Sequence, residues 1–170
     1  MALDFTKLKL RQRDGVTCGP SAAIVGAAML DPDYAAQLEQ TGWFAAEQAQ
    51  LHRELNAVWP RALGTTPMGM VSALNRHSSK RAVRYHWRFA QGSGAQLDGV
   101  RDAVTRGWPV PMLLGKVIPR HWVLLIGFES GRFRIYDPGV GDVLLATPAE
   151  LSGGLGFPQV FGYVVPDLRA

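Results

Sequence analysis

The chain contains one cysteine, Cys18, among its 170 residues. One cysteine cannot form a disulfide within the chain, so the fold must be held by its core, which suits a reducing compartment. Long apolar runs are also missing, because stretches such as WVLLIGF at 122–128 are far shorter than the roughly 20 residues of a membrane helix. The first 15 residues carry charges throughout and lack the apolar stretch of a signal peptide. We therefore predict a cytoplasmic protein without a membrane span, while export without a cleavable signal stays open.

Sequence patterns for metals and cofactors are absent as well. No group of His, Cys, Asp and Glu residues has the spacing of a metal site. No glycine-rich loop matches a phosphate-binding or dinucleotide-binding fingerprint. The sequence therefore predicts neither a metal nor a cofactor.

Positive charge is in mild excess, with a formal net charge of +4. An excess of this size permits an anionic partner but does not require one. Residues 76–88 form a basic stretch, most of which lies on or beside a predicted strand. In that strand the aromatic residues Tyr85, Trp87 and Phe89 alternate with basic residues. Single-stranded nucleic acid needs cations and aromatic rings on the same face, and here they lie on opposite faces. We interpret the stretch as a solvated surface and expect no nucleic-acid partner.

The bulk composition is that of a globular protein, with 47% hydrophobic and 19% charged residues. A chain of this length fits one domain, since domains commonly span about 100–200 residues. We therefore predict a single domain over residues 1–170. The sequence carries no signal for the oligomeric state.

The first half of the chain has the pattern of helices. The stretch 18–30 (CGPSAAIVGAAML) has the length of a buried helix, tolerates Pro20 in its first turn and is stopped by Asp31-Pro32. A second helix is expected over 43–59, where apolar residues follow helical spacing up to Pro60. A third is expected to begin at Pro67, with Thr66 as its N-cap.

The second half has mainly the pattern of strands. Strands are expected at 81–90, 109–115, 121–129, 131–139, 142–146 and 158–166, with a further short strand possible at 8–10. One amphipathic helix is expected at 96–107 and a capped helical turn at 147–154. Helices followed by a run of strands indicate an α+β fold with an antiparallel sheet.

Cys18 stands at the expected start of a helix. An ordinary thiol has a pKa of about 8.5, and helix N-termini or a cationic histidine favour the reactive thiolate. Gly19 leaves room for a substrate to approach, and the Cys18 N–H and the side-chain amide of Gln12 are candidate donors to an oxyanion. The competing interpretation is a small buried hydrophobic residue, which is the commoner use of a lone cysteine.

A base and a group that orients it are found in the strands. Of the four histidines, His52 and His77 are expected in solvent and His86 on the charged side of its strand. His121 opens the apolar strand 121–129, and Asp137 follows at the end of the next strand, so a hairpin would bring the two together. Competing interpretations are that Asp137 only structures its YDPG turn, that Asp142 is the orienting group, or that Asp14 is a partner of the cysteine.

These residues carry a family resemblance. The chain resembles papain-like cysteine peptidases of the bacteriocin-processing (double-glycine) type in a free-standing form. The matching segments span roughly residues 8–165: Gln12, CGP at 18–20, TTPMGM at 65–70, HWVLLIGFE at 121–129 and YDPGVGDV at 136–143. The resemblance implies a helical half with the cysteine, packed on a sheet half with the histidine and the aspartate. It also implies that Cys18 is the nucleophile, His121 the base and acid, Asp137 its orienting group and Gln12 part of an oxyanion hole.

The chain also departs from that family. Transporter-attached members carry membrane spans and an ATPase, and this sequence has neither. Arg120 stands before the histidine, where relatives often have a small residue, and could select an acidic substrate or point into solvent. The sequence predicts a thiol hydrolase that cleaves a peptide or amide bond in a peptide or protein substrate. Alternatives are a transferase or deamidase on the same fold, possibly a delivered toxin, and a non-catalytic binding module.

Overall fold

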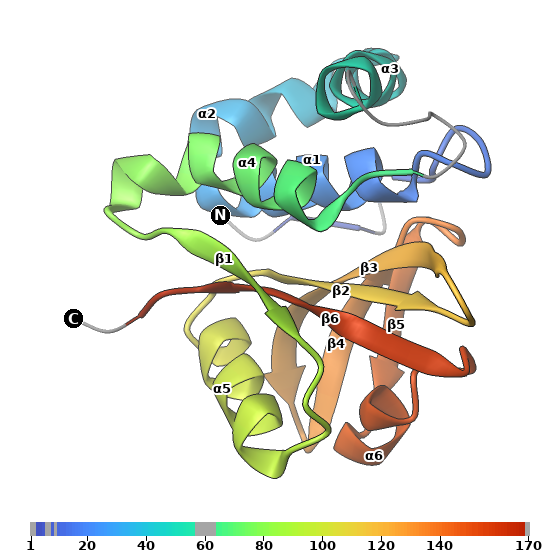
Figure 1. Cartoon of the computed structure of the whole chain (residues 1–170). Helices are drawn as coiled ribbons and strands as arrows, with labels where there is room; N and C mark the ends of the chain where they lie inside the picture. Colours follow the sequence, from blue (N-terminus) through green and yellow to red (C-terminus); the bar gives the residue numbers. More distant parts are fainter. Residues whose placement is uncertain (1–2, 6–7, 9, 57–63, 169–170) are drawn as a thin grey trace.

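The computed structural model describes residues 3–5, 8, 10–56 and 64–168 (Figure 1). Its first half is helical: α1 (Cys18–Leu30), α2 (Pro32–Ala35), a short 3-10 turn η1 (Ala36–Glu39), α3 (Trp43–Leu55), α4 (Pro67–Ser78) and a second turn η3 (Ser79–Arg81). The second half holds β1 (Tyr85–Phe89), β2 (Val110–Gly115), β3 (Pro119–Glu129), β4 (Arg132–Asp137), β5 (Asp142–Ala146) and β6 (Gln159–Pro166). Two helices, α5 (Gly94–Thr105) and α6 (Pro148–Ser152), lie between strands in the chain.

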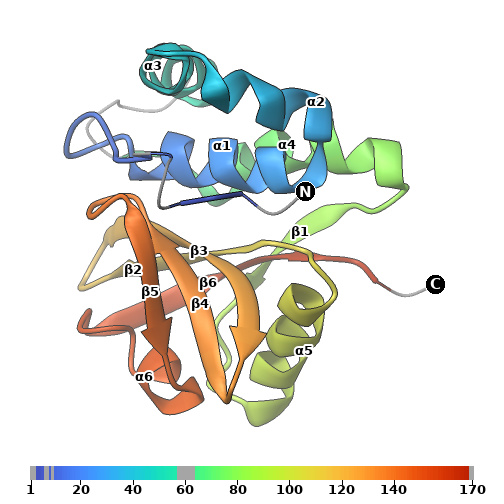
Figure 2. The ribbon, with the colours of Figure 1, turned by 180° about the vertical axis from the view of Figure 1, so that it is seen from behind.

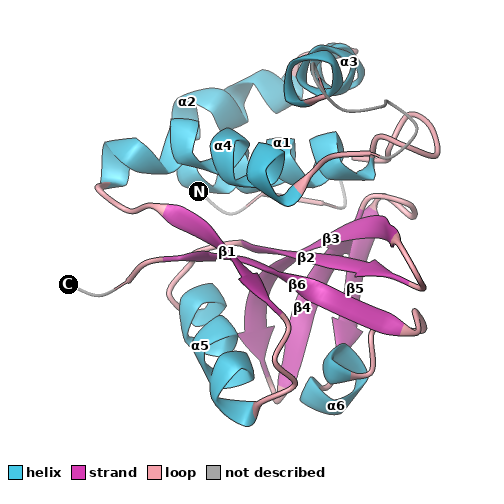
Figure 3. Ribbon diagram, in the orientation of Figure 1, coloured by secondary structure: helices cyan, strands magenta, loops and turns pink. Residues whose placement is uncertain are grey.

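The six strands form one sheet in the order β1-β6-β2-β3-β4-β5, with every neighbouring pair antiparallel. Helices α1 to α4 lie on one side of the sheet, while α5 and α6 lie on the other (Figures 1 and 2). The separation of a helical half from a strand-rich half is clear in Figure 3. The predicted α+β class with an antiparallel sheet is therefore confirmed.

Helix α1 is the central helix of the helical half. All of its residues except Met29 are buried, because it packs against α3, α4 and the sheet at once. A helix that is apolar around its whole circumference requires such a position. The burial of α1 fixes its first residue, Cys18, at the junction of the two halves.

The strand pair β3–β4 contains an irregularity that matters for the site. Near the turn, Glu129 pairs with Arg132 and Gly127 with Arg134, but farther along Leu125 pairs with Ile135 and Leu124 with Tyr136. One extra residue, Ile126, therefore stands in β3 as a β-bulge. The shifted register puts Asp137 opposite Val123, on the same face as His121, whereas the unshifted register would place it opposite Leu124 on the other face.

Some element boundaries differ from those expected. The strand predicted from residue 81 begins at Tyr85, because residues 79–81 form a 3-10 turn and Ala82 has a left-handed backbone with φ of 55°. Helix α3 ends at Leu55, and the expected end near Trp59 lies outside the described residues, as does part of the possible strand at 8–10. The short helix α2, capped by the Asp31 carboxylate, was not anticipated.

Among the described residues, no helix is long and apolar enough to cross a membrane.

Candidate active site

Cys18 is the first residue of α1 and is 4% exposed. The residue before it, Thr17, does not cap the helix with its side chain, because its hydroxyl accepts hydrogen bonds from the backbone N–H groups of Arg13 (3.0 Å) and Asp14 (3.1 Å). The N–H groups of the first turn are therefore not capped by Thr17. The positive end of the helix dipole lies beside Cys18. The thiol thus lies where a helix favours negative charge.

His121 and Asp137 form a close pair across the β3–β4 hairpin. His121 Nε2 lies 2.8 Å from Asp137 Oδ1, and that carboxylate also accepts a hydrogen bond of 2.8 Å from the Gly139 N–H. The β-bulge described above places both side chains on one face of the sheet. The carboxylate engages Nε2, so the other ring nitrogen, Nδ1, is left for the thiol.

Charge is balanced within this group of side chains. Burial alone would lower the pKa of His121, but the hydrogen bonds with Asp137 and Cys18, together with their negative charges, raise it to about 9. Burial would raise the pKa of Asp137, yet the hydrogen bond and charge of His121 hold it below its ordinary value. The arrangement therefore favours an imidazolium held between a carboxylate and the sulfur.

Gln12 lies beside the same turn. Its backbone N–H donates to Pro138 O (2.8 Å), and its side-chain Nε2 donates one hydrogen to Asp14 O (2.7 Å). A methyl group added at Gly139 would lie 3.1 Å from Asp137 Oδ1, 3.6 Å from His121 Cε1 and 4.0 Å from Gln12 Oε1. Gln12, His121 and Asp137 therefore border one small space. The Gln12 atom that faces it is Oε1, which is buried and has no hydrogen-bond partner among the described residues.

Phe157 is a site residue that sequence reasoning missed. Its ring stacks on the His121 imidazole with centroids 5.5 Å apart and an interplanar angle of 15°. Phe157 follows α6 and lies far from His121 in the chain, so no local pattern indicates the contact. The stacking restricts the orientation of the imidazole plane.

A narrow recess of about 90 Å³ opens beside Cys18. Its other lining residues come from three segments: Gly15, Val16, Gly64, Ile118, Pro119 and Arg120. Arg120 is exposed at the rim, so the structure places this cation next to the recess while it remains in contact with solvent.

The remaining candidates fall elsewhere. Asp14 structures its own loop, where its carboxylate accepts from the Val16 N–H (3.1 Å), and Asp142 accepts from the Val143 N–H (2.7 Å). His77 is bonded to Asp31 at 3.1 Å. His52 was expected in solvent, which is wrong: it is 1% exposed, because it lies on the inner face of α3.

Gly19 also has a different role from the one expected. A methyl group at this position would lie 2.3 Å from Thr65 Oγ1 and 2.4 Å from Thr65 Cβ. The space that glycine leaves is therefore occupied by Thr65 and is not open to a substrate. Gly19 permits the close approach of the segment before α4 to the start of α1.

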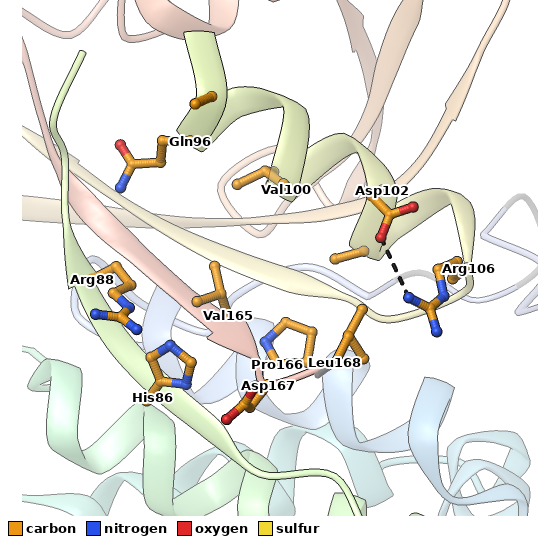
Figure 4. A pocket seen from close by; sticks show the side chains of 13 residues that line it. His86, Arg88, Gln96, Val100, Asp102, Arg106, Val165, Pro166, Asp167 and Leu168 are labelled. Carbon is orange, nitrogen blue, oxygen red and sulfur yellow. Dashed lines mark hydrogen bonds and ion pairs between the residues drawn. The ribbon is translucent and has the colours of Figure 1, made fainter. Parts of the chain in front are cut away.

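A larger hollow, of about 490 Å³, lies between α5, β1 and the end of β6 (Figure 4). Cations and anions both line it, including Arg88, Asp102 and Arg106, and Asp102 pairs with Arg106 at 3.4 Å. None of Cys18, His121, Asp137 and Gln12 lines this hollow. Of these four candidate residues, Cys18 lines the smaller recess.

The comparisons with known proteins bear on the fold. No protein-family model and no curated protein matches the chain. Among solved structures, it is similar to a double-glycine motif protease from an AMS/PCAT transporter, solved with its leader peptide, at 14% identity and a TM-score of 0.52 over 91% of this chain and 85% of that one. It is also similar to the peptidase domain of Streptococcus ComA, a bifunctional ABC transporter, at 16% identity and a TM-score of 0.51 over 91% of this chain and 92% of that one. The chain therefore has the papain-like fold of double-glycine peptidase domains.

Proposed function

We propose that the protein is a cysteine-peptidase-like hydrolase that cleaves a peptide or amide bond through an acyl-enzyme on Cys18. The observation that carries the proposal is the His121–Asp137 pair at 2.8 Å, with the imidazole also hydrogen-bonded to a thiol at a helix N-terminus. The proposed catalytic residues are Cys18, His121, Asp137 and Gln12. The proposal treats residues 1–170 as one catalytic domain, active in a reducing compartment such as the cytoplasm.

The reaction follows from these positions. The Cys18 thiolate attacks the carbonyl carbon, and the carbonyl electrons move to the oxygen, which the Cys18 N–H and Gln12 Nε2 stabilise. When the intermediate collapses, the C–N bond breaks and the leaving amine takes the proton from the His121 imidazolium. Water then attacks the thioester while His121 removes its proton. The C–S bond breaks, which releases a carboxylic acid and restores the thiolate–imidazolium pair.

The recess beside Cys18 supports a small side chain next to the cleaved bond. At about 90 Å³ the recess is much smaller than the hollow of about 490 Å³ between α5, β1 and β6. One solved neighbour is a double-glycine motif protease in complex with the leader peptide. We therefore propose a peptide or protein substrate with glycine or another small residue at this position.

The proposal is tested first by alkylation. At pH 6 an ordinary thiol is only about 0.3% thiolate, so iodoacetamide should react with it slowly. We expect Cys18 of the native protein to react at least tenfold faster than in the urea-denatured chain, and His121→Ala to remove the difference. His86→Ala serves as the matched control, because His86 lies on β1 outside this site. Equal rates in native and denatured protein would contradict the proposal and favour a binding module.

Cleavage is tested with a library of peptides, some of them containing Gly-Gly, whose products are identified by mass spectrometry. Products that depend on Cys18 and carry a new carboxyl group support hydrolysis. Products joined to an added amine would indicate a transferase instead.

A further inference from the structure

Gln48 is a buried polar residue that the mechanism above does not use. It lies on the inner face of α3 and is 1% exposed. Its Oε1 accepts a hydrogen bond from the Arg13 N–H (2.8 Å), and its Nε2 donates to Arg11 O (3.3 Å). These are the backbone groups directly before and after Gln12. A buried amide is expensive unless it is bonded, and here both ends are bonded to the same short segment.

The other side of this segment is held by the sheet. The Gln12 N–H donates to Pro138 O at 2.8 Å, and Arg11 Nε donates to Gly139 O at 3.2 Å. A methyl group at Gly141 would lie 2.8 Å from Arg11 Cβ, so the two backbones are in direct contact. Residues 11–13 are therefore fixed between α3 and the turn that begins at Asp137.

We propose that Gln48 is a positioning residue that fixes Gln12 as an oxyanion donor, an inference that rests on the proposed function. A long amide side chain is useful to a transition state only when it is held in place beforehand, and the loss of one such donor typically slows a reaction about 10²- to 10³-fold. Displacement by about 1 Å has a similar effect. The Gln48 amide acts through the backbone on each side of Gln12 and does not touch the reacting atoms.

The test compares two reagents that react at Cys18. Acylation by p-nitrophenyl acetate passes through a tetrahedral oxyanion, whereas alkylation by iodoacetamide is a displacement at carbon that forms none. We expect Gln48→Leu to slow acylation at least about fivefold and to leave alkylation within twofold of wild type. Gln50→Leu, an exposed position on the same helix, is the control and should change neither rate.

A double-variant measurement separates positioning from a general structural effect. Gln12→Ala should lower the ratio of acylation to alkylation by itself, and adding Gln48→Leu to it should lower that ratio no further. An additive loss, or equal slowing of both reactions by Gln48→Leu alone, would overturn the inference. If wild-type alkylation shows no dependence on His121, the proposed function fails instead, so the two failures are distinguishable.

Gln48→Glu keeps the test available if the leucine variant does not fold. A protonated carboxyl can accept from the Arg13 N–H and donate to Arg11 O, as the amide does, whereas a carboxylate can only accept. The ratio of acylation to alkylation, taken relative to wild type at each pH, should therefore be highest at low pH and fall as the introduced carboxyl ionises. A ratio that matches wild type at every pH would contradict the role.

Discussion

The His121 imidazole is held charged by the groups on either side of it. Its pKa in the folded protein is about 9, compared with 6.5 for an ordinary histidine, whereas the pKa of Asp137 is lowered. The raised pKa of His121 contributes stability that is fully present below pH 6.5 and is lost as the pH rises through about 9. The lowered pKa of Asp137 contributes stability above its unfolded value and loses it as the pH falls. The pair should therefore stabilise the fold most between about pH 4 and pH 6.5.

The pKa of His121 can be measured directly by NMR. We expect the imidazole signals of His121 to titrate with a midpoint near 9 and Asp137→Asn to lower that midpoint. The advantage of wild type over His121→Ala in free energy of unfolding should shrink between pH 6.5 and 9 by about 3 kcal/mol. A midpoint near 6.5 in the wild type would contradict the charged pair.

Arg120 should influence which reagents reach the thiol, because it lines the recess beside Cys18 and is exposed to solvent. In water, a cation attracts an anionic reagent about 8 Å away by about 0.5 kcal/mol. Arg120→Ala should therefore lower the ratio of iodoacetate to iodoacetamide alkylation rates about twofold at low salt, and the difference should vanish near 1 M salt because of screening. Arg132→Ala, at the far end of the hairpin, is the control. An unchanged ratio would mean that Arg120 does not influence what reaches the thiol.

The residues of the candidate site differ in how far the sequence could reveal them. Cys18, His121 and Asp137 stand at positions marked by local patterns, a helix start and the two outer ends of a hairpin. Phe157 and Gln48 act through contacts between segments distant in the chain, and a ring or an amide carries no local mark of such a contact. Burial of His52 was missed because polar neighbours in the chain do not show which face of the helix is covered.

At the scale of elements, the contact between the start of α1 and the segment before α4 depends on Gly19. Gly19→Ala puts a methyl group 2.3 Å from Thr65 Oγ1 and should destabilise the protein by at least about 2 kcal/mol. Gly99→Ala, in α5, meets no atom within 4 Å and should stabilise it by up to about 1 kcal/mol. Chemical denaturation of both variants measures the difference. Equal stabilities would contradict the close contact.

The order and type of most elements could be predicted, because helical spacing and alternation are local properties of the chain. The β-bulge was not predicted, although Gly127 inside an apolar strand is a recognised signal for one. A plain hairpin brings the outer ends of two strands together but does not decide which face each side chain takes. That decision depends on the single extra residue, Ile126.

At the scale of the whole molecule, one core extends across both halves. It joins Ile24 and Leu74 of the helical half to Leu124, Ile135 and other residues of the sheet. We expect one cooperative unfolding transition, with the same midpoint by far-ultraviolet circular dichroism and by tryptophan fluorescence. The five tryptophans are distributed over both halves, so separate unfolding of one half would give two midpoints and contradict a single domain.

The bulge in β3 limits how this chain could change its length during evolution. His121 and Asp137 are separated by sixteen positions in the chain. The spacing follows an odd–even rule, because each residue added to or removed from either strand turns the later side chain to the opposite face of the sheet. Only changes in pairs, or changes taken up wholly by the turn at Ser130 and Gly131, keep the imidazole and the carboxylate together. Natural relatives that retain the pair should accordingly show paired insertions in these strands and unrestricted ones at the turn.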